Sequence, residues 1–312
     1  MVKAAVIGAG GVGGYLASVL SRTYENVTLV ARGKRGEAIR REGLSMDSGQ
    51  FGHVLTHPRV VASAGELEDQ DLIFICVKNY SLEEVCGELK GHLRPDTILV
   101  PVMNGVDPGD RVRALLPGSP VVDSLIYIIS YAREDHSICH DCDFGNIPIG
   151  MQTSSGTPEE RDRILDLVYG YMKGAGIQVS RSRDIRAAIW KKFILNSSYN
   201  VSTARFNTTI GPIRDDPQKA EEFELLTKEA YTLGRALGVR LEQADLDYVI
   251  HRFRHEYADS ASSSFQRDVA AGRRTELETF SGYVVKTAEK IGLAVPVSRA
   301  YYEALLEQGR SV

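Results

Sequence analysis

Apolar positions in the first part of the chain form short runs separated by longer segments with helical periodicity. Four of these runs have the length of strands: 3–7, 26–30, 71–77 and 97–103. The run at 71–77, DLIFICV, is apolar throughout, which is typical of a strand that is covered on both faces. Strands alternating with helices predict an α/β domain.

Further elements follow from local signals. Short runs at 121–130, 145–150 and 177–180 predict additional strands, and 43–61 alternates strand-like runs with turns. The segment Ser81-Leu82-Glu83-Glu84 has the residues of a capping box and predicts a helix start. Another helix is expected after Thr157, which is followed by a proline and by an acid at the third helical position.

Beyond about residue 182 the pattern is helical almost throughout, so we place a domain boundary there, with domains 1–182 and 183–312. The segments with helical periodicity are 190–202, 217–237, 242–257 and 275–291, with a last helix from Pro296. The expected architecture is therefore an α/β domain followed by an all-α domain.

The first helix of the second part carries a polar stripe. At about 100° per residue, Lys192, Asn196 and Asn200 fall within an arc of roughly 80°. Trp190 and Ile194, with Val201, project from the opposite side. Asparagines lower helix propensity, so their presence makes more sense if the amides have a partner. The alternative is an ordinary solvated face.

A glycine-rich turn follows the first strand. Gly8, Gly10 and Gly13 form a GxGxxG pattern, with Ala9, Gly11 and Val12 in the intervening positions. Between a strand and a helix, this pattern is typical of dinucleotide binding, because the glycines allow the backbone to approach a pyrophosphate at the helix N-terminus. The sequence therefore predicts these six residues as cofactor contacts.

The end of the second strand indicates which nicotinamide cofactor is used. An NAD site usually has an acid there, whereas this chain has Arg32, with Lys34 and Arg35 nearby. An arginine can pair with a 2′-phosphate, so we predict NADP(H). The alternative is a solvated charged turn. Lys78 and Asn104 follow later strands and are expected on the same rim, although each also fits an ordinary loop or turn.

The second part holds two more candidates. A serine cluster at 262–264 can cap a helix and offer hydroxyl and amide groups to a carboxylate. Glu276 lies close to a predicted helix start and fits a capping or surface acid as well as a site residue.

Composition narrows the function classes. The net charge of -4 and the lack of a basic run argue against nucleic-acid binding, and no apolar stretch is long enough to span a membrane. The N-terminus enters a strand at once, so we expect a cytoplasmic protein. The 4 cysteines do not suggest a disulfide framework. Cys139 and Cys142 form one CxxC near His136 and His140, which is weak support for a metal, and we predict none.

In the order and spacing of these pieces the chain resembles the ketopantoate reductase (2-dehydropantoate 2-reductase) family nearly end to end. The matching pieces are GAGGVGG with Arg32, Val77-Lys78, Asn104-Gly105, Trp190-x-Lys192 with Asn196 and Asn200, Ser264 ahead of Asp268, and Arg274-Thr275-Glu276 with Gly282. The resemblance implies an N-terminal Rossmann-type domain, a helical C-terminal domain like that of 6-phosphogluconate dehydrogenase, and an active site between them. It also implies NADPH-dependent reduction of 2-dehydropantoate to (R)-pantoate, toward pantothenate and coenzyme A.

The resemblance also implies roles for particular residues. Lys192 matches the catalytic general acid, and Glu276 matches a carboxylate that contacts substrate and cofactor. Lys78 and Asn104 match residues near nicotinamide and substrate. Asn196 and Asn200 match residues that bind hydroxyl groups of the substrate, and Ser264 matches a contact to the substrate carboxylate.

Two departures from the family pattern leave alternatives open. Met103 stands where a glutamine often precedes Asn-Gly, and Ala261 stands where some members have an asparagine. Another small 2-oxo acid on the same scaffold is therefore a second expectation for the substrate. A non-catalytic NADPH-binding sensor is a third reading, although it would not need the polar stripe or Glu276. A homodimer is a further expectation.

Overall fold

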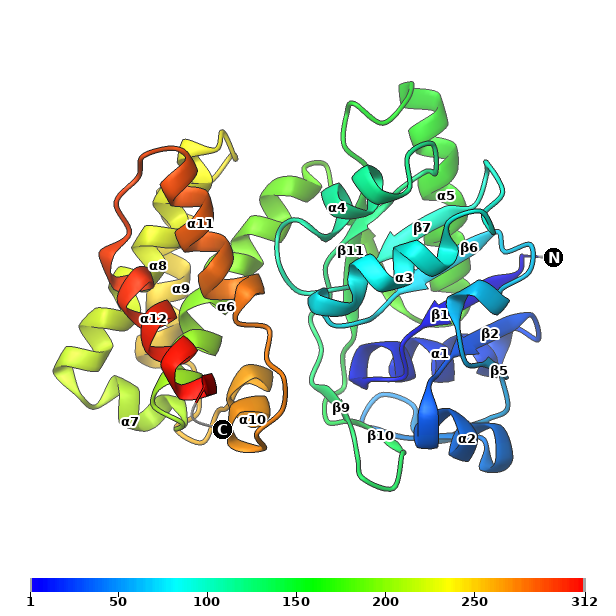
Figure 1. Cartoon of the computed structure of the whole chain (residues 1–312), viewed down its shortest axis with the longest axis horizontal. Helices are drawn as coiled ribbons and strands as arrows, with labels where there is room; N and C mark the ends of the chain where they lie inside the picture. The colour runs from blue at the N-terminus through cyan, green and yellow to red at the C-terminus, as the bar shows by residue number, and fades with distance from the viewer. Residues whose placement is uncertain (1, 311–312) are drawn as a thin grey trace. The chain divides into compact units, whose positions relative to one another are not determined.

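The computed structural model describes residues 2–310. The chain divides into two compact units, Met1–Ile185 and Arg186–Val312 (Figure 1). The first unit is α/β and the second is helical, as the sequence predicts for the fold class. The predicted boundary lies slightly earlier in the chain, and its use as a border between independent domains stays a prediction.

A five-stranded parallel sheet forms the centre of the first unit. Its strand order is β5-β2-β1-β6-β7. The strands are β1 (Ala4–Ile7), β2 (Val27–Val30), β5 (Arg59–Val61), β6 (Leu72–Ile75) and β7 (Ile98–Pro101). Neighbours pair in parallel, with Ala4 opposite both Val27 and Leu72. The carboxyl ends of β1, β2, β6 and β7 therefore meet at one edge, where the predicted cofactor residues follow.

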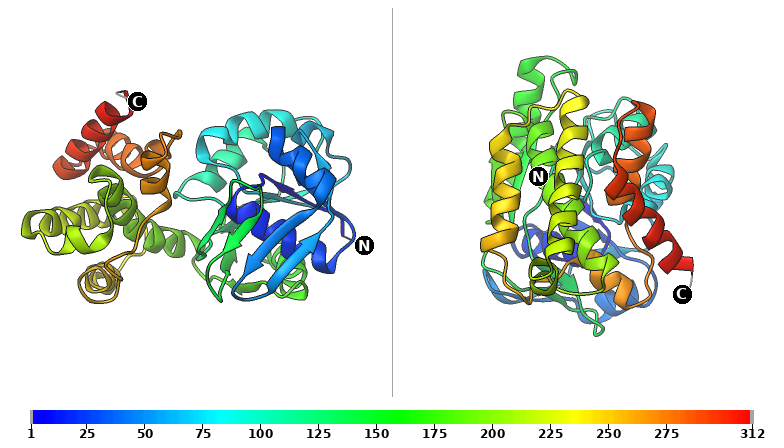
Figure 2. Two further views of the ribbon diagram at one scale, coloured as in Figure 1. Left: turned by 90° about the horizontal axis from the view of Figure 1, so that it is seen from below. Right: turned by 90° about the vertical axis from the view of Figure 1, so that its left-hand side faces the viewer.

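Alternate residues of these strands bury opposite faces of the sheet. Ala4 and Val6 of β1 pack into one core with α1 (Gly11–Thr23) and α5 (Pro158–Gly174). Ala5 and Ile7 pack into the other core with α3 (Leu82–Leu89) and α4 (Pro108–Leu115). Helices cover both faces (Figure 2), which explains why the strands read as continuous apolar runs.

Two smaller sheets complete the first unit. One has the order β4-β3-β10-β9, and its strands are β3 (Leu44–Ser48), β4 (Gly52–Thr56), β9 (Ser130–Ala132) and β10 (Ile138–His140). The other has the order β12-β11-β8, and its strands are β8 (Asp123–Ser124), β11 (Asn146–Gly150) and β12 (Gln178–Arg181). The predicted strand over 121–130 is thus two short strands in different sheets.

Both predicted helix starts are confirmed, because α3 begins after Ser81 and α5 after Thr157, but only one has the expected cap. Thr157 caps α5 as expected, because its side chain accepts from the Glu160 backbone N–H and the Glu160 side chain accepts from that of Thr157. The capping box at Ser81 is wrong. Ser81 ends the 3-10 helix η2 (Asn79–Ser81), with φ -105 and ψ -2, and its side chain makes no cap hydrogen bond to α3.

The second unit is helical. Its elements are α6 (Ile185–Arg205), α7 (Ile210–Arg214), α8 (Pro217–Ala236), α9 (Gln243–His255), α10 (Ser264–Ala270), the π-helix η3 (Glu278–Gly282), α11 (Tyr283–Lys290) and α12 (Pro296–Arg310). Phe223 of α8 stacks on Phe253 of α9 with ring centroids 3.8 Å apart. The segment 275–291, predicted as one helix, contains η3 followed by α11. Between residues 2 and 310, no helix has both the length and the hydropathy to cross a membrane.

Candidate active site

Residues 8–13, called the glycine loop below, run from the end of β1 into the first turn of α1. Gly8 has a φ of +105°, which a side chain would strain. A Cβ on Gly13 would lie 1.9 Å from the Gly8 carbonyl oxygen, so only glycine fits there. A Cβ on Gly10 would meet nothing within 4 Å. The backbone at Gly10 is therefore accessible to a ligand.

The start of α1 is suited to an anion. Its N-cap, Gly10, offers no side-chain cap, and the first turn holds no acidic residue. The N–H groups of a first helical turn have no intrahelical acceptors, and the helix dipole favours negative charge there. Together with the open space at Gly10, this arrangement fits the pyrophosphate of a dinucleotide.

Two side chains that the sequence did not assign to the glycine loop fix its backbone. The Ser130 hydroxyl donates to the Gly11 carbonyl at 3.0 Å. Arg35 donates to the Ala9 carbonyl at 3.4 Å and to the Arg133 carbonyl at 3.2 Å. Ser130 and Arg133 are distant from the loop in sequence, so no local pattern could have indicated these contacts.

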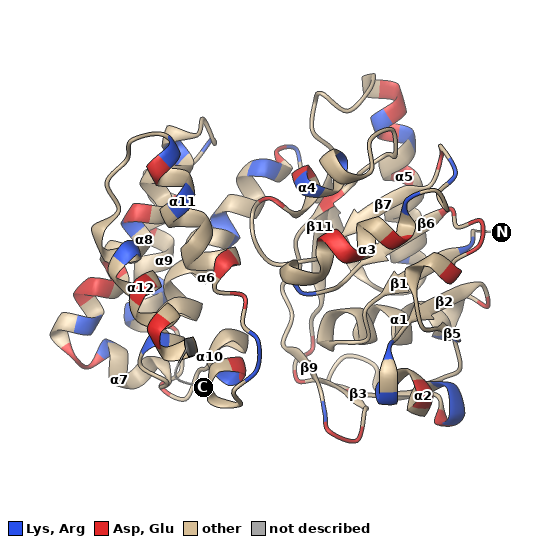
Figure 3. Ribbon diagram, in the orientation of Figure 1, with Lys and Arg blue, Asp and Glu red and all other residues tan. Residues whose placement is uncertain are grey.

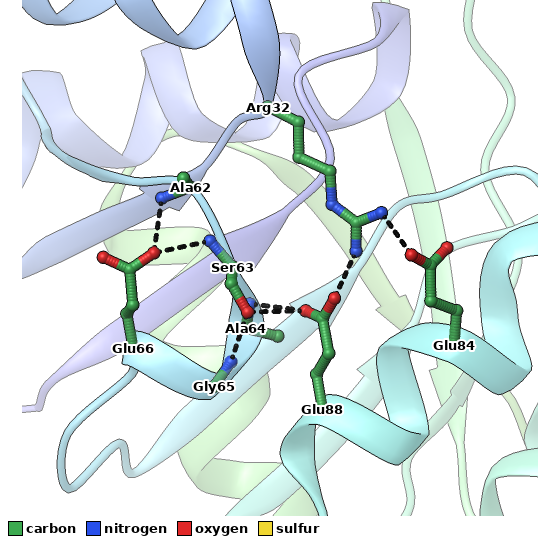
Figure 4. A network of polar contacts seen from close by, with 8 residues as sticks. All are labelled: Arg32, Ala62, Ser63, Ala64, Gly65, Glu66, Glu84 and Glu88. Atoms are coloured by element: carbon green, nitrogen blue, oxygen red, sulfur yellow. Dashed lines mark hydrogen bonds and ion pairs between the residues drawn. The ribbon is translucent and has the colours of Figure 1, made fainter.

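Arg32 precedes α2 (Gly33–Glu42) as its N-cap and is exposed. Its guanidinium group donates to Glu84 at 2.7 Å and to Glu88 at 2.6 Å, both on α3 (Figure 4). Arg32 is thus not simply a solvated turn residue. Its pairing with a 2′-phosphate stays a prediction, because the described contacts are to carboxylates.

The ends of β6 and β7 carry the other two rim candidates. Lys78 is the half-buried N-cap residue of η2, and Asn104 is half-buried beyond β7. Asn79, which the sequence did not single out, donates from Nδ2 to the Asn104 carbonyl at 2.8 Å. Arg111 in turn donates to the Asn79 side chain at 3.3 Å and to its carbonyl at 3.2 Å. The position of Asn104 therefore depends on a buried asparagine and an arginine.

In the second unit, α6 has the predicted two-sided character. Trp190, Ile194 and Val201 are 3%, 0% and 1% exposed. On the other side, Lys192 and Asn196 are half-buried and Asn200 is 6% exposed. Asn200 therefore does not fit the alternative of a solvated polar face.

Lys192 is electrostatically coupled to Glu276. Burial lowers the pKa of Lys192 from its usual 10.5 to about 8, and attraction to Glu276 opposes this decrease. Glu276 is only 5% exposed, so it is not an ordinary surface acid. Its carbonyl accepts from Thr279 N–H at 3.0 Å, which places Glu276 in the first turn leading into η3. A lysine with this pKa can both hold and release a proton near neutral pH.

The serine cluster divides into different roles. Ser263 is the N-cap of α10, because its hydroxyl oxygen accepts from the Gln266 N–H at 3.0 Å. The Ser263 hydroxyl also lies 2.8 Å from that of Thr203 on α6. Ser264 is the first residue of α10 and is half-buried. The cluster is therefore tied to the helix that carries Lys192.

An aromatic cluster of Phe193, Phe265 and Phe280 connects the segments that carry the candidates. The ring of Phe280 stacks on that of Phe193 at 6.5 Å and on that of Phe265 at 6.0 Å between centroids. Phe193 and Phe265 directly follow Lys192 and Ser264 in the chain, and Phe280 is in η3, just beyond Glu276. No sequence pattern singles out Phe265 or Phe280 as site residues.

The cysteine pair lies in β10 and just beyond it. Cys139 is buried in β10, whereas the Cys142 sulfur lies 3.2 Å from Nε2 of His140. The other ring nitrogen of His140 is 2.7 Å from the Ser48 hydroxyl. Across residues 2–310, no three histidine, cysteine or acidic side chains form a group that could hold a metal ion.

Comparison with known protein families accounts for both units. The model described as "Ketopantoate reductase PanE/ApbA" matches residues 4–153, and the corresponding C-terminal model matches residues 184–308. The chain belongs to the ketopantoate reductase family. It is therefore an oxidoreductase, and family membership supports a nicotinamide cofactor.

Individual relatives of this ketopantoate reductase family member extend over most of its length. An "uncharacterized oxidoreductase YkpB" of Bacillus subtilis is 29% identical over 304 residues, covering 97% of this chain and 98% of its own. A 2-dehydropantoate 2-reductase of Mesorhizobium japonicum is 30% identical over 264 residues, covering 77% and 78%. The crystal structure of a PanE/ApbA family ketopantoate reductase from Ralstonia eutropha has a TM-score of 0.89 at 24% identity and covers 99% of both chains. The last likeness shows the shared fold.

Proposed function

We propose that this ketopantoate reductase family member reduces 2-dehydropantoate to (R)-pantoate with NADPH, a step toward pantothenate and coenzyme A. The observation that carries the proposal is Lys192, whose pKa of about 8 suits an acid, on a helix face with two asparagine amides. The printed names of several relatives, including that of Mesorhizobium japonicum, support the substrate. Arg32, in place of an acid after β2, supports NADPH.

When bound, NADPH supplies the hydride. Hydride addition to the keto carbon leaves negative charge on the carbonyl oxygen. The Lys192 ammonium group polarises that oxygen beforehand and then donates a proton from Nζ, so that the product is an alcohol and the amine is neutral. Protonation from solvent restores the ammonium group. Because the pKa of Lys192 is about 8, most molecules carry the ammonium group at neutral pH, and this group is acidic enough to donate its proton.

The other residues hold substrate and cofactor. Asn196 and Asn200 lie one and two turns beyond Lys192 and are proposed to bind hydroxyl groups without changing the charge balance. Ser264 is proposed to bind the substrate carboxylate. The proposed role of Glu276 is to keep the lysine protonated and to contact substrate and cofactor. Arg32, Lys78, Asn104 and the glycine loop are proposed to bind the cofactor.

Two apolar residues favour a different 2-oxo acid as the alternative substrate. Met103, in place of a glutamine, is 6% exposed and belongs to the core beside α3. Ala261, in place of an asparagine, packs against the core around Phe223 and Phe253. One of these apolar side chains is in a core and the other packs against one, where the family pattern has polar groups, and this difference supports another small 2-oxo acid as the alternative.

Steady-state kinetics with NADPH separate these possibilities. We expect the highest kcat/KM for 2-dehydropantoate among a panel that includes 2-oxoisovalerate and 2-oxoglutarate, followed by loss of the reduced cofactor's absorbance. A clear preference for another 2-oxo acid would replace the proposed substrate. Tight NADPH binding with no turnover of any 2-oxo acid would instead favour the sensor.

A further inference from the structure

The candidate cation for the cofactor's 2′-phosphate is already engaged by two carboxylates. Nη1 of Arg32 is 2.7 Å from Glu84, and Nη2 is 2.6 Å from Glu88. Both glutamates lie on α3, four residues apart, and therefore share one helix face. Both terminal nitrogens of the guanidinium group are thus occupied (Figure 4).

The two glutamates are held differently. The second oxygen of Glu88 accepts from the Ser63 hydroxyl at 3.0 Å and from the Ala64 N–H at 2.8 Å, so its carboxylate is fixed to the segment after β5. The Glu84 side chain is 58% exposed, and its pairing is with Arg32. Glu84 is therefore the carboxylate that a ligand can displace.

The two basic residues that follow Arg32 in α2 have different surroundings. Arg35 donates to the backbone carbonyls of Ala9 and Arg133, which fixes it beside the glycine loop. Lys34 is exposed at the start of α2, and Figure 3 shows basic residues on α2 and acidic ones on α3. A phosphate dianion approaching Arg32 would meet Glu84 and Glu88 at the same guanidinium group.

We propose that Glu84 and Glu88 compete with the 2′-phosphate for Arg32 and thereby restrain the preference of this enzyme for NADPH over NADH. The inference rests on the proposed NADPH-dependent function. A phosphate oxygen that takes the place of Glu84 must break an ion pair and remain beside an unpaired carboxylate. NADH has no 2′-phosphate and carries neither cost. The two glutamates are therefore determinants of cofactor specificity rather than catalytic residues.

The test is Glu84→Gln, with dissociation constants for NADPH and NADH measured on the full chain by the fluorescence of the reduced nicotinamide. We expect NADPH to bind roughly three- to tenfold more tightly and NADH to be unchanged, in line with the modest strength of exposed ion pairs. Glu25→Gln is the control, because it removes the same charge from an exposed residue ahead of β2, at the edge of the sheet opposite the one that Arg32 follows. A decrease or no change in NADPH affinity would overturn the inference, as would an equal gain in the control.

Arg32→Ala shows whether the effect passes through the guanidinium group. In that background, Glu84→Gln should no longer increase NADPH affinity threefold or more. An increase of the same size would mean that Glu84 acts without Arg32, and would overturn the proposed competition. If the variants keep the parent's ratio of NADPH to NADH dissociation constants and still reduce a 2-oxo acid, only this inference is refuted. Absence of 2-oxo acid reduction in the parent protein refutes the proposed function.

Discussion

The ring of Phe280 stacks on the ring of Phe193 with centroids 6.5 Å apart and an interplanar angle of 16°. Both side chains are almost fully buried, at 1% and 2% exposed. Because Phe193 follows Lys192 and Phe280 lies in η3, just beyond Glu276, this contact joins the two segments that carry the ionisable groups. The packing of two phenylalanines thus supports the electrostatics of the site.

The first prediction concerns this contact. Phe280→Leu should lower the free energy of unfolding by about 1–2 kcal/mol, since the smaller side chain leaves the core incompletely filled. It should also reduce kcat by roughly tenfold, because a misplacement of catalytic groups by about 1 Å is costly. Denaturant unfolding and steady-state kinetics measure the two effects.

Phe206→Leu is the control for that variant. Phe206 is packed edge-on against Tyr301 at 5.9 Å in the same helical unit, away from the described Phe193–Phe280 stack. It should lose stability but keep its turnover. If both variants reduced turnover equally, the effect would be one of general destabilisation rather than of positioning.

Lys192→Ala is predicted to lower kcat by about two to four orders of magnitude while NADPH still binds, because proton donation and polarisation are lost. Lys191→Ala is a close control, since Lys191 is its chain neighbour and pairs with Asp245 at 2.8 Å instead. Kinetics with 2-dehydropantoate and a binding measurement with NADPH separate the two variants. Near-normal turnover of Lys192→Ala would remove the lysine from the mechanism.

The pH dependence of the reaction should reflect the lysine. Reduction needs the ammonium form, so kcat/KM should fall as the pH rises through about 8, where Lys192 loses its proton. The reverse oxidation needs the neutral amine and should rise over the same range. A profile of reduction that stays flat well above this pH would contradict the assignment.

Glu276→Gln should move that alkaline limb to lower pH. Glu276 raises the pKa of Lys192 by charge attraction, so removing its charge leaves burial less opposed and the pKa falls. Glu278→Gln is the matched control, because Glu278 is exposed and bound to Lys286 at 2.6 Å. Its profile should keep the parent's midpoint, whereas an unshifted midpoint in Glu276→Gln would break the proposed coupling.

Two glycine variants should separate folding from cofactor binding. Gly13→Ala places a Cβ against the Gly8 carbonyl and should destabilise the first unit. Gly10→Ala should fold normally, because Gly10 has a φ of -79 and open space, but should weaken NADPH binding at least tenfold by filling the approach to the backbone. Gly170→Ala also adds a methyl group where nothing lies within 4 Å and should leave binding unchanged. Thermal unfolding and fluorescence titration give the two readouts.

Local patterns predicted what depends on neighbours in sequence. The glycine loop between β1 and α1, the buried side of α6 and the cap at Thr157 all follow from short-range rules of backbone conformation and periodicity. Ser81 has the right residues for a cap, yet the preceding residues form a 3-10 turn that takes Ser81 out of the N-cap conformation. A competing local structure therefore overrode the motif.

Contacts between distant segments could not be predicted. Strand β10 pairs with β3, so that Ile138 lies beside Met46, and nothing near either residue encodes that pairing. The place of Arg32 after β2 could be predicted from the sequence, but its carboxylate partners lie on α3, more than one element away. The stacking of Phe265 on Phe280 likewise depends on how helices pack and not on periodicity.

The π-helix η3 has a geometric consequence for Glu276. A π turn contains about one residue more than an α turn, and each residue turns a helix by about 100°. Glu276 lies in the turn just ahead of η3, so the direction in which its carboxylate points relative to α11 depends on the number of residues in Glu278–Gly282. Losing a single residue from this stretch would rotate the segment that carries Glu276 about the axis of α11 and turn the carboxylate away from its present direction, even if every remaining amino acid kept its identity.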